Sequence, residues 1–248
     1  MELSRFFQEN HRAALAFSGG ADSAYLLYAA CRAGAEVRAY YVKTPFQPAF
    51  ELADARRLAR ELGADLTVLE LNILADPAIA VNPPDRCYHC KKKLFSTIAA
   101  QAAADGFGLL IDGTNASDDA SDRPGMRALQ ELAVRSPLRE CGLTKDRIRA
   151  LSREAGLFTW DKPAYACLAT RIPTGEAVTA EKLAAVETME AGLAALGFRD
   201  FRVRTERGAA RLQVCAEQLP LVLERREAVL AALKPYCGQV TLDLEVRG

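Results

Sequence analysis

The sequence predicts an α/β protein, with a mostly parallel sheet in a large first domain and a smaller α+β domain after it. Three observations carry this prediction. Short apolar runs alternate with longer helical runs through residues 12–157, which is the pattern of βαβ units. A turn of Ser and Gly follows the first apolar run, at residues 18–20. After residue 175 the order changes to helix, strand, strand, helix, strand.

Strands of the first domain are expected over residues 12–17, 35–42 and 65–71, and a strand followed by a turn over residues 108–115. Helices are expected over residues 22–32, 48–63, 90–106 and 144–157. The second of these is amphipathic, because Leu52, Ala55 and Leu58 fall on one face, and Gly63 ends it. Thr144 is the expected N-cap of the last.

Residues 116–127 are polar and rich in acids, and we expect a long functional loop there. The domain boundary is expected near residues 172–175, which gives domains 1–172 and 173–248. In the second domain helical runs cover residues 180–198 and 216–237, and strand-like runs cover residues 201–206, 210–215 and 239–246.

The composition limits the classes of function. Lys and Arg together number 32, as do Asp and Glu, so the zero net charge gives no electrostatic support for nucleic-acid or membrane binding. No apolar run approaches the ~20 residues that span a bilayer, and the first residues lack the pattern of a signal peptide. Seven cysteines in a chain of 248 residues argue against a disulfide scaffold. We therefore expect a cytoplasmic protein with free thiols.

The turn after the first strand reads SGGADS and has the residue types of a phosphate-binding loop. Gly19 and Gly20 let the backbone approach an anion, and Ser18 and Ser23 add hydroxyl donors beside the first helical N–H groups. Asp22 is placed either in the first turn of the helix or to hold a Mg²⁺ that bridges phosphates. Neither G-x-x-x-x-G-K-[ST] nor G-x-G-x-x-G is present. By spacing alone, an ordinary turn with Ser and Asp caps is an equal alternative.

The order S-G-G-x-D-S resembles the signature of the ATP pyrophosphatase superfamily, whose phosphate loop is called the PP-loop, and it follows the first strand as in that superfamily. A second match is the sequence DGTN, which ends at Asn115. The resemblance implies an adenine nucleotide alpha hydrolase-like fold for the first domain. It also implies ATP and Mg²⁺ as cofactors, with Asp22 catalytic and with Gly113, Thr114 and Asn115 binding the nucleotide beside the first loop.

Four further stretches resemble the LarE family of sulfur transferases across nearly the whole chain. They are NPPDRCYHCKKKLF (82–95), DGTNASDDASDRPGMRALQELAVRSPL (112–138), KPAYACLATRIPTGE (162–176) and the ending LDLEVRG. The resemblance implies that ATP adenylates a carboxylate of pyridinium-3,5-biscarboxylic acid mononucleotide, that sulfur displaces AMP to give a thiocarboxylate, and that this happens twice per molecule. Such enzymes finish the nickel-pincer nucleotide of lactate racemase. The implied partners are this nucleotide and a sulfide donor, and we expect a homo-oligomer.

Three cysteines are candidates for the sulfur chemistry. Cys87 and Cys90 form C-x-x-C at the start of a helix, directly before Lys91, where the helix N-terminus and the cation favour thiolates. Cys167 lies in ACLATR, four residues before Arg171. The family resemblance offers two forms of the reaction: Cys167 gives up its own sulfur and becomes dehydroalanine, or it joins Cys87 and Cys90 to hold a [4Fe-4S] cluster with one open iron. We predict the cluster, with Cys167 and Arg171 catalytic.

Other functions compete with this prediction. A PP-loop thiolase acting on transfer RNA uses similar cysteine sets, and zero net charge argues against it. A nucleotide-binding regulator with a structural zinc would need four ligands, and His89 lies inside the C-x-x-C, where it has difficulty reaching the same metal. Further charged residues are candidates for contacts with ATP, Mg²⁺ or substrate: Asp119, Asp122, Arg123, Arg127 and Arg204.

Overall fold

The computed structural model describes residues 2–118 and 124–247. Internal contacts divide the chain into two compact units. The first unit comprises Met1–Ile73 and Asp85–Lys162, and the second comprises Leu74–Pro84 and Pro163–Gly248. The second unit thus includes a short piece of chain that interrupts the first. The predicted domain boundary between residues 172 and 173 stays a prediction.

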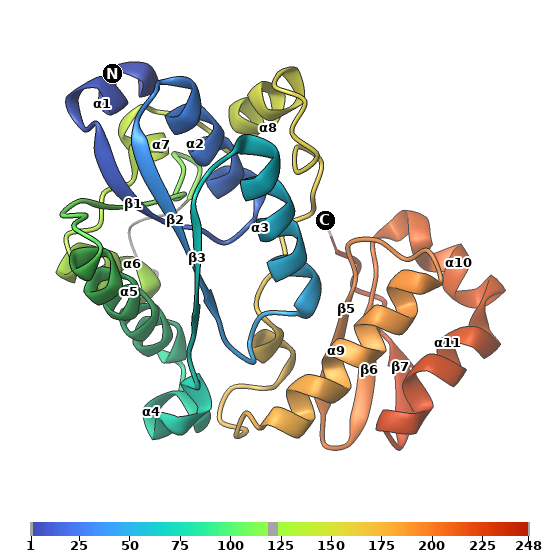
Figure 1. The fold of residues 1–248 in the computed structure, drawn as a ribbon. Helices are drawn as coiled ribbons and strands as arrows, with labels where there is room; N and C mark the ends of the chain where they lie inside the picture. The colour runs from blue at the N-terminus through green and yellow to red at the C-terminus, as the bar shows by residue number, and fades with distance from the viewer. Residues whose placement is uncertain (1, 119–123, 248) are drawn as a thin grey trace. The chain divides into compact units, whose positions relative to one another are not determined.

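Four parallel strands form the sheet of the first unit, in the order β3-β2-β1-β4 (Figure 1). They are β1 (Arg12–Ala16), β2 (Glu36–Lys43), β3 (Leu66–Glu70) and β4 (Leu110–Asp112). The predicted α/β fold is confirmed. The strand order runs from β1 to β2 on one side, whereas β4 lies on the other side of β1, so the topological switch point of the sheet is between β1 and β4. In sheets of this kind, ligands bind at the carboxyl ends of the strands beside the switch point. Ala16 pairs with Asp112, so the loops after β1 and β4 leave the sheet side by side.

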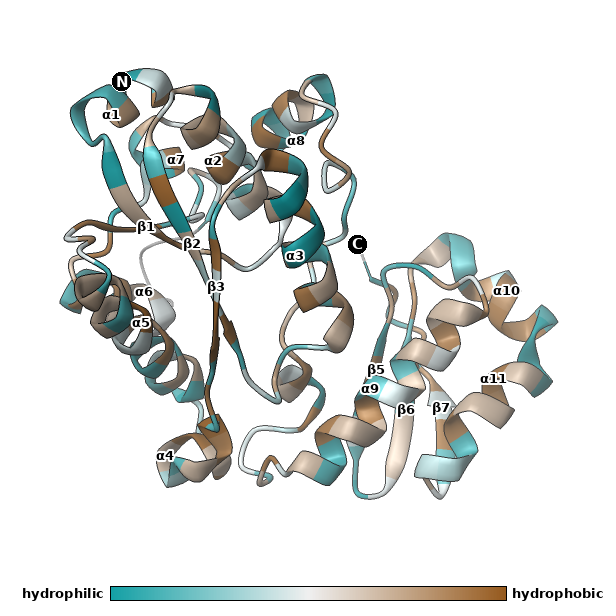
Figure 2. Cartoon of the chain, in the orientation of Figure 1, coloured by the Kyte–Doolittle hydropathy of each residue, from teal (hydrophilic) through white to brown (hydrophobic). Residues whose placement is uncertain are grey.

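Helices cover both faces of this sheet (Figure 1). Four of them share one hydrophobic core with Leu15 of β1: α1 (Leu3–Glu9), α2 (Ala21–Arg32), α3 (Ala49–Leu62) and α8 (Lys145–Glu154). The other face carries α5 (Arg86–Ala104), whose Ile98 belongs to a second core with Ala14 and Tyr40. Figure 2 shows that hydrophobic residues are concentrated in the strands and on parts of these helices. Within residues 2–118 and 124–247, no helix has the length and apolar character that crossing a membrane requires.

Local signals place most helix ends in the first unit as predicted. Gly63 ends α3 in the left-handed conformation, with φ of 63°, and the Thr144 side chain caps α8 by accepting a hydrogen bond from the backbone N–H of Arg147. Two expectations are corrected. The helix predicted from residue 90 already begins at Arg86, and α6 (Pro124–Glu131) begins inside the predicted loop. Proline suits a first helical position, because its missing N–H would have no acceptor there. The short helices α1 and α7 (Pro137–Glu140) are not among the predicted helices.

The second unit is built around a three-stranded sheet in the order β5-β6-β7. The strands are β5 (Arg202–Glu206), β6 (Ala209–Gln213) and β7 (Gln239–Leu242), of which β5 and β6 are antiparallel and β6 and β7 parallel. The helices are α4 (Pro77–Ala80), α9 (Ala180–Ala195), α10 (Leu219–Glu224) and α11 (Arg226–Leu233), with the 3₁₀ turns η2 (Leu168–Arg171), η3 (Ala216–Gln218) and η4 (Lys234–Tyr236). The 3₁₀ turn η1 (Ile73–Ala75) lies where the chain first enters this unit. Leu193 of α9 and Val203 of β5 are fully buried, and the predicted α+β character is confirmed.

Two segments of the second unit differ from expectation. The helical run predicted over residues 216–237 is divided into η3, α10, α11 and η4, with a non-helical Arg225 between the two α-helices. Pro220 and Pro235 each lie in the first turn of a new piece, because proline lacks the N–H that a continuing helix needs. The strand predicted over residues 239–246 ends at Leu242, where the side chain of Asp243 accepts from the N–H of Glu245 at 3.1 Å and starts a turn.

Candidate functional site

The SGGADS loop joins β1 to α2 and is closed by hydrogen bonds among its own residues. The Ser18 Oγ lies 3.1 Å from the Ser23 Oγ and accepts from the N–H of Gly20 at 3.3 Å. The Ser23 Oγ donates to the carbonyl oxygen of Gly20 at 3.2 Å. Both predicted serine hydroxyls are therefore held at the start of α2.

The N-terminus of α2 has the character of an anion site. Gly20 is its N-cap and provides no side-chain cap, and the first N–H to bond back into the helix is that of Ala24, at 2.9 Å from the Gly20 oxygen. The three N–H groups before it, from Ala21 to Ser23, have no acceptor within the helix. These donors and the positive end of the helix dipole together favour a bound phosphate.

Two glycines are required by close approaches of the backbone. A Cβ on Gly113 would lie 2.9 Å from the nitrogen and 3.0 Å from the Cα of Ser23, so the loop after β4 packs directly on the first turn of α2. Gly19 has φ of 72°, and a Cβ there would lie 3.2 Å from the Cβ of Ala55 on α3. A side chain at either position would displace a loop. The structure thus brings the two predicted nucleotide-binding motifs together.

Asp112 organises the loop after β4. Its buried carboxylate accepts from the N–H of Thr114 at 3.2 Å, from the hydroxyl of Thr114 at 2.5 Å and from the hydroxyl of Ser136 at 2.7 Å. Asn115 follows and is also buried, and its Nδ2 donates to Asp22 Oδ2 at 3.2 Å. This last hydrogen bond joins the DGTN loop to the SGGADS loop.

One carboxylate oxygen of Asp22 is available to a ligand. Burial raises its pKa, the hydrogen bond from Asn115 lowers it, and the charge of Asp118 raises it further. The Oδ1 atom is buried and has no hydrogen-bond partner within the part of the chain that the structure describes. Buried polar atoms are rarely left unpaired, and carboxylate oxygens are the preferred ligands of Mg²⁺. Asp22 therefore fits the predicted Mg²⁺, which it would hold together with phosphate oxygens.

Lys162 contacts the phosphate loop and is not among the predicted site residues. Its Nζ lies 2.7 Å from Asp54 Oδ2 on α3 and 3.3 Å from the carbonyl oxygen of Gly19. Only 15% of the Lys162 side chain is exposed. The sequence offers one signal for this residue, because Lys162 is the first residue of the family-like stretch KPAYACLATR. Its contact with Asp54 could not be predicted, because Asp54 lies 108 residues earlier in the chain.

The C-x-x-C pair lies in the first two turns of α5, with Cys87 exposed and Cys90 half-buried. Between them the buried Tyr88 directs its hydroxyl at Glu131 of α6, at 2.8 Å. Lys92 lies 3.0 Å from that hydroxyl and 2.9 Å from the Glu131 carboxylate. The Tyr88 contact with α6 thus holds the turn that carries the two thiols.

In the second unit the predicted catalytic residue Arg171 is buried, with 0% of its side chain exposed. Its Nε and one terminal nitrogen bind both carboxylate oxygens of Glu190 on α9, at 2.9 and 3.0 Å. The other terminal nitrogen donates to the carbonyl oxygen of Ala166 at 2.7 Å and to the hydroxyl of Thr170 at 2.9 Å. These contacts hold the backbone just before Cys167 and the side chain of Thr170 after it. They favour positioning as the role of Arg171.

Two arginines of β5 bind the same segment. Arg202 donates to the carbonyl oxygen of Ala164 at 2.7 Å, and Arg204 donates to that of Thr170 at 2.8 Å. The residues around the half-buried Cys167 are therefore tied to the sheet of the second unit through their carbonyl groups.

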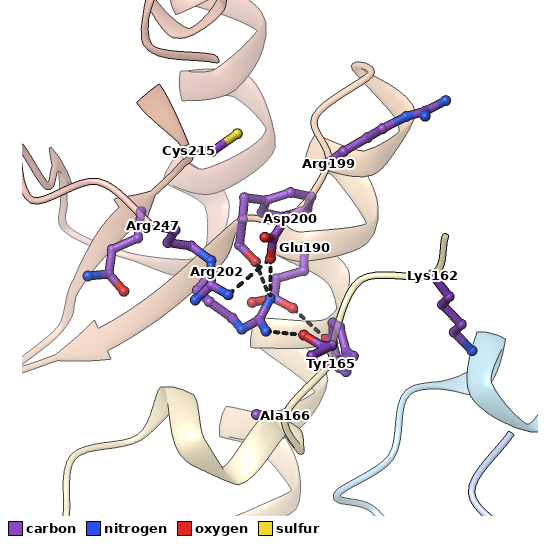
Figure 3. A network of polar contacts seen from close by, with 12 residues as sticks. Lys162, Tyr165, Ala166, Glu190, Arg199, Asp200, Arg202, Cys215 and Arg247 are labelled. Atoms are coloured by element: carbon purple, nitrogen blue, oxygen red, sulfur yellow. Dashed lines mark hydrogen bonds and ion pairs between the residues drawn. The ribbon is translucent and has the colours of Figure 1, made fainter. Parts of the chain in front are cut away.

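This part of the second unit accumulates positive charge. Burial, followed by the charges of Arg171 and Arg247, lowers the pKa of Arg202 to about 10. Burial and then the charge of Arg171 also lower the pKa of Arg204. Figure 3 shows Arg202 and Arg247 near Asp200, whose carboxylate lies 3.8 Å from the first and 3.0 Å from the second. Burial is the larger cause for both arginines, and the carboxylates of Glu190 and Asp200 offset part of the charge of Arg202.

The predicted iron–sulfur ligands do not meet within either unit. Cys87 and Cys90 belong to the first unit, and Cys167 belongs to the second. Over residues 2–118 and 124–247, no group of three or more His, Cys, Asp or Glu side chains is arranged to hold a metal ion. The [4Fe-4S] cluster is thus not supported by the structure and stays a prediction.

Three residues proposed for the long loop, Asp119, Asp122 and Arg123, lie outside the described residues. Arg127 lies on α6, with its guanidinium carbon 3.7 Å from the centroid of the Tyr88 ring. Arg127 therefore adds to the contacts that hold the C-x-x-C turn.

Comparisons with known proteins agree with this architecture, although no family model matches the chain. An uncharacterized protein of Synechocystis is 39% identical over 88% of this chain and 81% of its own length. The pyridinium-3,5-bisthiocarboxylic acid mononucleotide synthase of Lactiplantibacillus plantarum is 36% identical over 94% of this chain and 86% of its own length. A tRNA-specific 2-thiouridylase MnmA of Thermotoga is 26% identical over 60% of this chain and 53% of its own length.

The parallel sheet and the S-G-G-x-D-S loop at its switch point define a protein of the PP-loop superfamily. Within that superfamily, the chain belongs to the family of the pyridinium-3,5-bisthiocarboxylic acid mononucleotide synthases, the LarE family. The predicted family and fold class are confirmed.

The packing of Gly113 on Ser23 generates a first prediction. We expect Gly113→Ala to weaken binding of MgATP by roughly one to two orders of magnitude, because its Cβ would push the DGTN loop away from α2. Gly108→Ala is the matched control, since a Cβ there meets open space. Calorimetric titration with MgATP measures the difference, and equal affinity of the Gly113→Ala variant and the wild type would contradict the site.

Asp22 generates a second prediction. Burial disfavours its carboxylate, so Asp22 lowers the stability of the fold as the pH rises through its raised pKa. Asp22→Asn should therefore have a Tm at pH 7 at least as high as the wild type, and should abolish AMP formation. The difference in Tm should narrow as the pH falls toward the ordinary Asp pKa of about 4, and it should vanish well below that pH, where the carboxyl is protonated in both the folded and the unfolded chain. A lower Tm for Asp22→Asn at pH 7 would show that the carboxylate stabilises the fold instead.

Proposed function

We propose that the protein is an ATP-dependent sulfur transferase that converts the carboxylates of pyridinium-3,5-biscarboxylic acid mononucleotide to thiocarboxylates in the synthesis of the nickel-pincer nucleotide. The observation that carries the proposal is the pairing of the two nucleotide loops at the carboxyl ends of β1 and β4, in a chain 36% identical to a synthase of the bisthiocarboxylic acid product. The function is that of an AMP-forming enzyme.

Adenylation is assigned to the first unit. The N–H groups at the start of α2 and the hydroxyls of Ser18 and Ser23 bind the phosphates of ATP. Asp22, oriented by Asn115, would hold a Mg²⁺, which would neutralise charge on the departing pyrophosphate. A substrate carboxylate oxygen attacks the α-phosphorus, and pyrophosphate leaves. The acyl-adenylate then carries AMP as a good leaving group in place of an oxide.

Sulfur delivery is assigned to the segment around Cys167. Its backbone is held by Arg171 and Arg204, so the thiol has a defined position. A sulfur nucleophile attacks the acyl carbon and expels AMP. Cys87 and Cys90 are the predicted partners of Cys167 in this step, and the alternative is that Cys167 itself donates its sulfur.

The arginines of the second unit support a small anionic substrate. Arg204 is partly exposed and lies near the charges of Arg171 and Arg211, and the substrate has a phosphate and two carboxylates that such a cation would bind. The chain as a whole has zero formal net charge, which favours this substrate over transfer RNA. Transfer-RNA thiolation is the second candidate function, because the chain is also similar to tRNA-specific 2-thiouridylases MnmA. We also propose a cytoplasmic location and a homo-oligomer.

The acceptor distinguishes the two candidates. We expect release of AMP and pyrophosphate from ATP to be stimulated by pyridinium-3,5-biscarboxylic acid mononucleotide and not by transfer RNA. Chromatographic measurement of AMP and pyrophosphate with each acceptor, under anaerobic conditions, checks this. Stimulation by transfer RNA alone would replace the proposed function with the second candidate.

The source of sulfur is tested by mass spectrometry of the protein after turnover. If the three cysteines act together, Cys87→Ala, Cys90→Ala and Cys167→Ala should each abolish activity, and the mass of the wild type should not change. Cys31→Ala, on α2, is the control and should stay active. A loss of the mass of hydrogen sulfide at Cys167, or full activity of the Cys87→Ala and Cys90→Ala variants, would show that Cys167 is a consumed donor.

A further inference from the structure

Lys162 is a cation that contacts the backbone of the phosphate loop. It lies in the first unit, as do Gly19 and Asp54, and the chain then enters the segment of Cys167. The Lys162–Asp54 pair is more enclosed than most ion pairs among residues 2–118 and 124–247, with 15% and 30% of the two side chains exposed. Ion pairs at such depth are less screened by salt than surface pairs, so this one can hold a defined geometry.

The peptide group between Gly19 and Gly20 is hydrogen-bonded at both its carbonyl oxygen and its N–H. Its carbonyl oxygen accepts from Lys162 at 3.3 Å, and its N–H donates to the Ser18 hydroxyl at 3.3 Å. In a trans peptide these two groups point in opposite directions. Lys162 and Ser18 together therefore define which way this peptide faces.

Contacts with other residues are needed to fix the orientation of this peptide, because both flanking residues are glycines. Glycine at φ of 72° has access to several backbone conformations at little cost, so the local chain does not prevent rotation of the peptide. A rotated peptide would turn the Gly19 carbonyl oxygen toward the Ser18 hydroxyl. That oxygen would then repel the phosphate oxygens that the loop is proposed to bind.

We propose that Lys162, anchored by Asp54, is a positioning residue that keeps the Gly19–Gly20 peptide facing so that the loop presents donors and not a carbonyl oxygen to the phosphates of ATP. The inference rests on the proposed binding of ATP. Asp54 supplies the anchor, because the lysine is held 2.7 Å from its carboxylate. In this arrangement Lys162 acts through the loop and does not leave Asp54 when the nucleotide binds.

Binding measurements with two ligands test the proposal. Lys162→Met should weaken binding of MgATP about tenfold, the effect of losing one charge-assisted hydrogen bond, and should leave binding of adenosine unchanged, because adenosine has no phosphate. Lys182→Met is the matched control. Lys182 also lies 2.7 Å from a carboxylate, that of Glu176, and 2.8 Å from a backbone carbonyl oxygen, that of Ala177, on the surface of the second unit.

Asp54→Asn separates positioning from direct contact with phosphate. If Lys162 acts through the loop, Asp54→Asn removes its anchor and should also weaken MgATP binding. If Lys162 instead moves to the phosphates, loss of the competing carboxylate should tighten MgATP binding, and the proposal is overturned. Lys162→Arg should restore most of the affinity, because a guanidinium can keep both contacts.

The outcomes also separate this inference from the proposed function. A wild-type protein that binds no MgATP would contradict the proposed function itself. A wild type that binds MgATP, with a Lys162→Met variant that binds it equally well, contradicts only the role of Lys162. Equal loss of MgATP and adenosine binding in Lys162→Met, with a lowered Tm, would show a purely structural role and would also overturn the proposal.

Discussion

The pairing of β1 with β4 is the constraint on which the candidate site depends. Ala14 lies opposite Leu110 and Ala16 opposite Asp112, so both strands end at the same level at the switch point of the sheet. Only this register allows Gly113 to lie against the first turn of α2 and Asn115 to reach Asp22. A slip of one residue would turn Asp112 to the other face of the sheet and separate it from Thr114 and Ser136.

The carboxylates of Asp22 and Glu190 differ in how fully they are hydrogen-bonded. In the first unit, Asp22 keeps one buried carboxylate oxygen without a hydrogen-bond partner among the described residues, and the start of α2 has no side-chain cap. Both features cost stability, and both provide groups for a ligand. In the second unit, Glu190 is saturated by Arg171, Tyr165 and the N–H of Val203. Loss of one partner of such a buried pair typically costs about 3–5 kcal/mol, so this network serves as a frame for the Cys167 segment.

Local sequence signals predicted much of the first unit, because its strands, caps and loop chemistry depend on neighbours in the chain. The SGGADS turn, the end of α3 at Gly63 and the cap at Thr144 are of this kind. The contacts that long-range packing creates could not be predicted. Lys162 meets Asp54 across 108 residues, and the burial of Arg171 follows from Glu190, which looks like one more charged residue of a helix. Prolines account for two wrong predictions. A proline begins α6 where a loop was predicted, and prolines begin new helical pieces where one continuous helix was predicted in the second unit.

Hydrogen–deuterium exchange with and without MgATP tests the central claim most directly, because it reads the backbone of both loops in the unmodified protein. Joint protection of residues 18–24 and residues 113–117 is expected, since the two loops form one site at the ends of β1 and β4. The protection should require both Mg²⁺ and the phosphates, and adenosine should not produce it. Protection of only one of the two segments, or of neither in a protein that binds MgATP, would contradict the account.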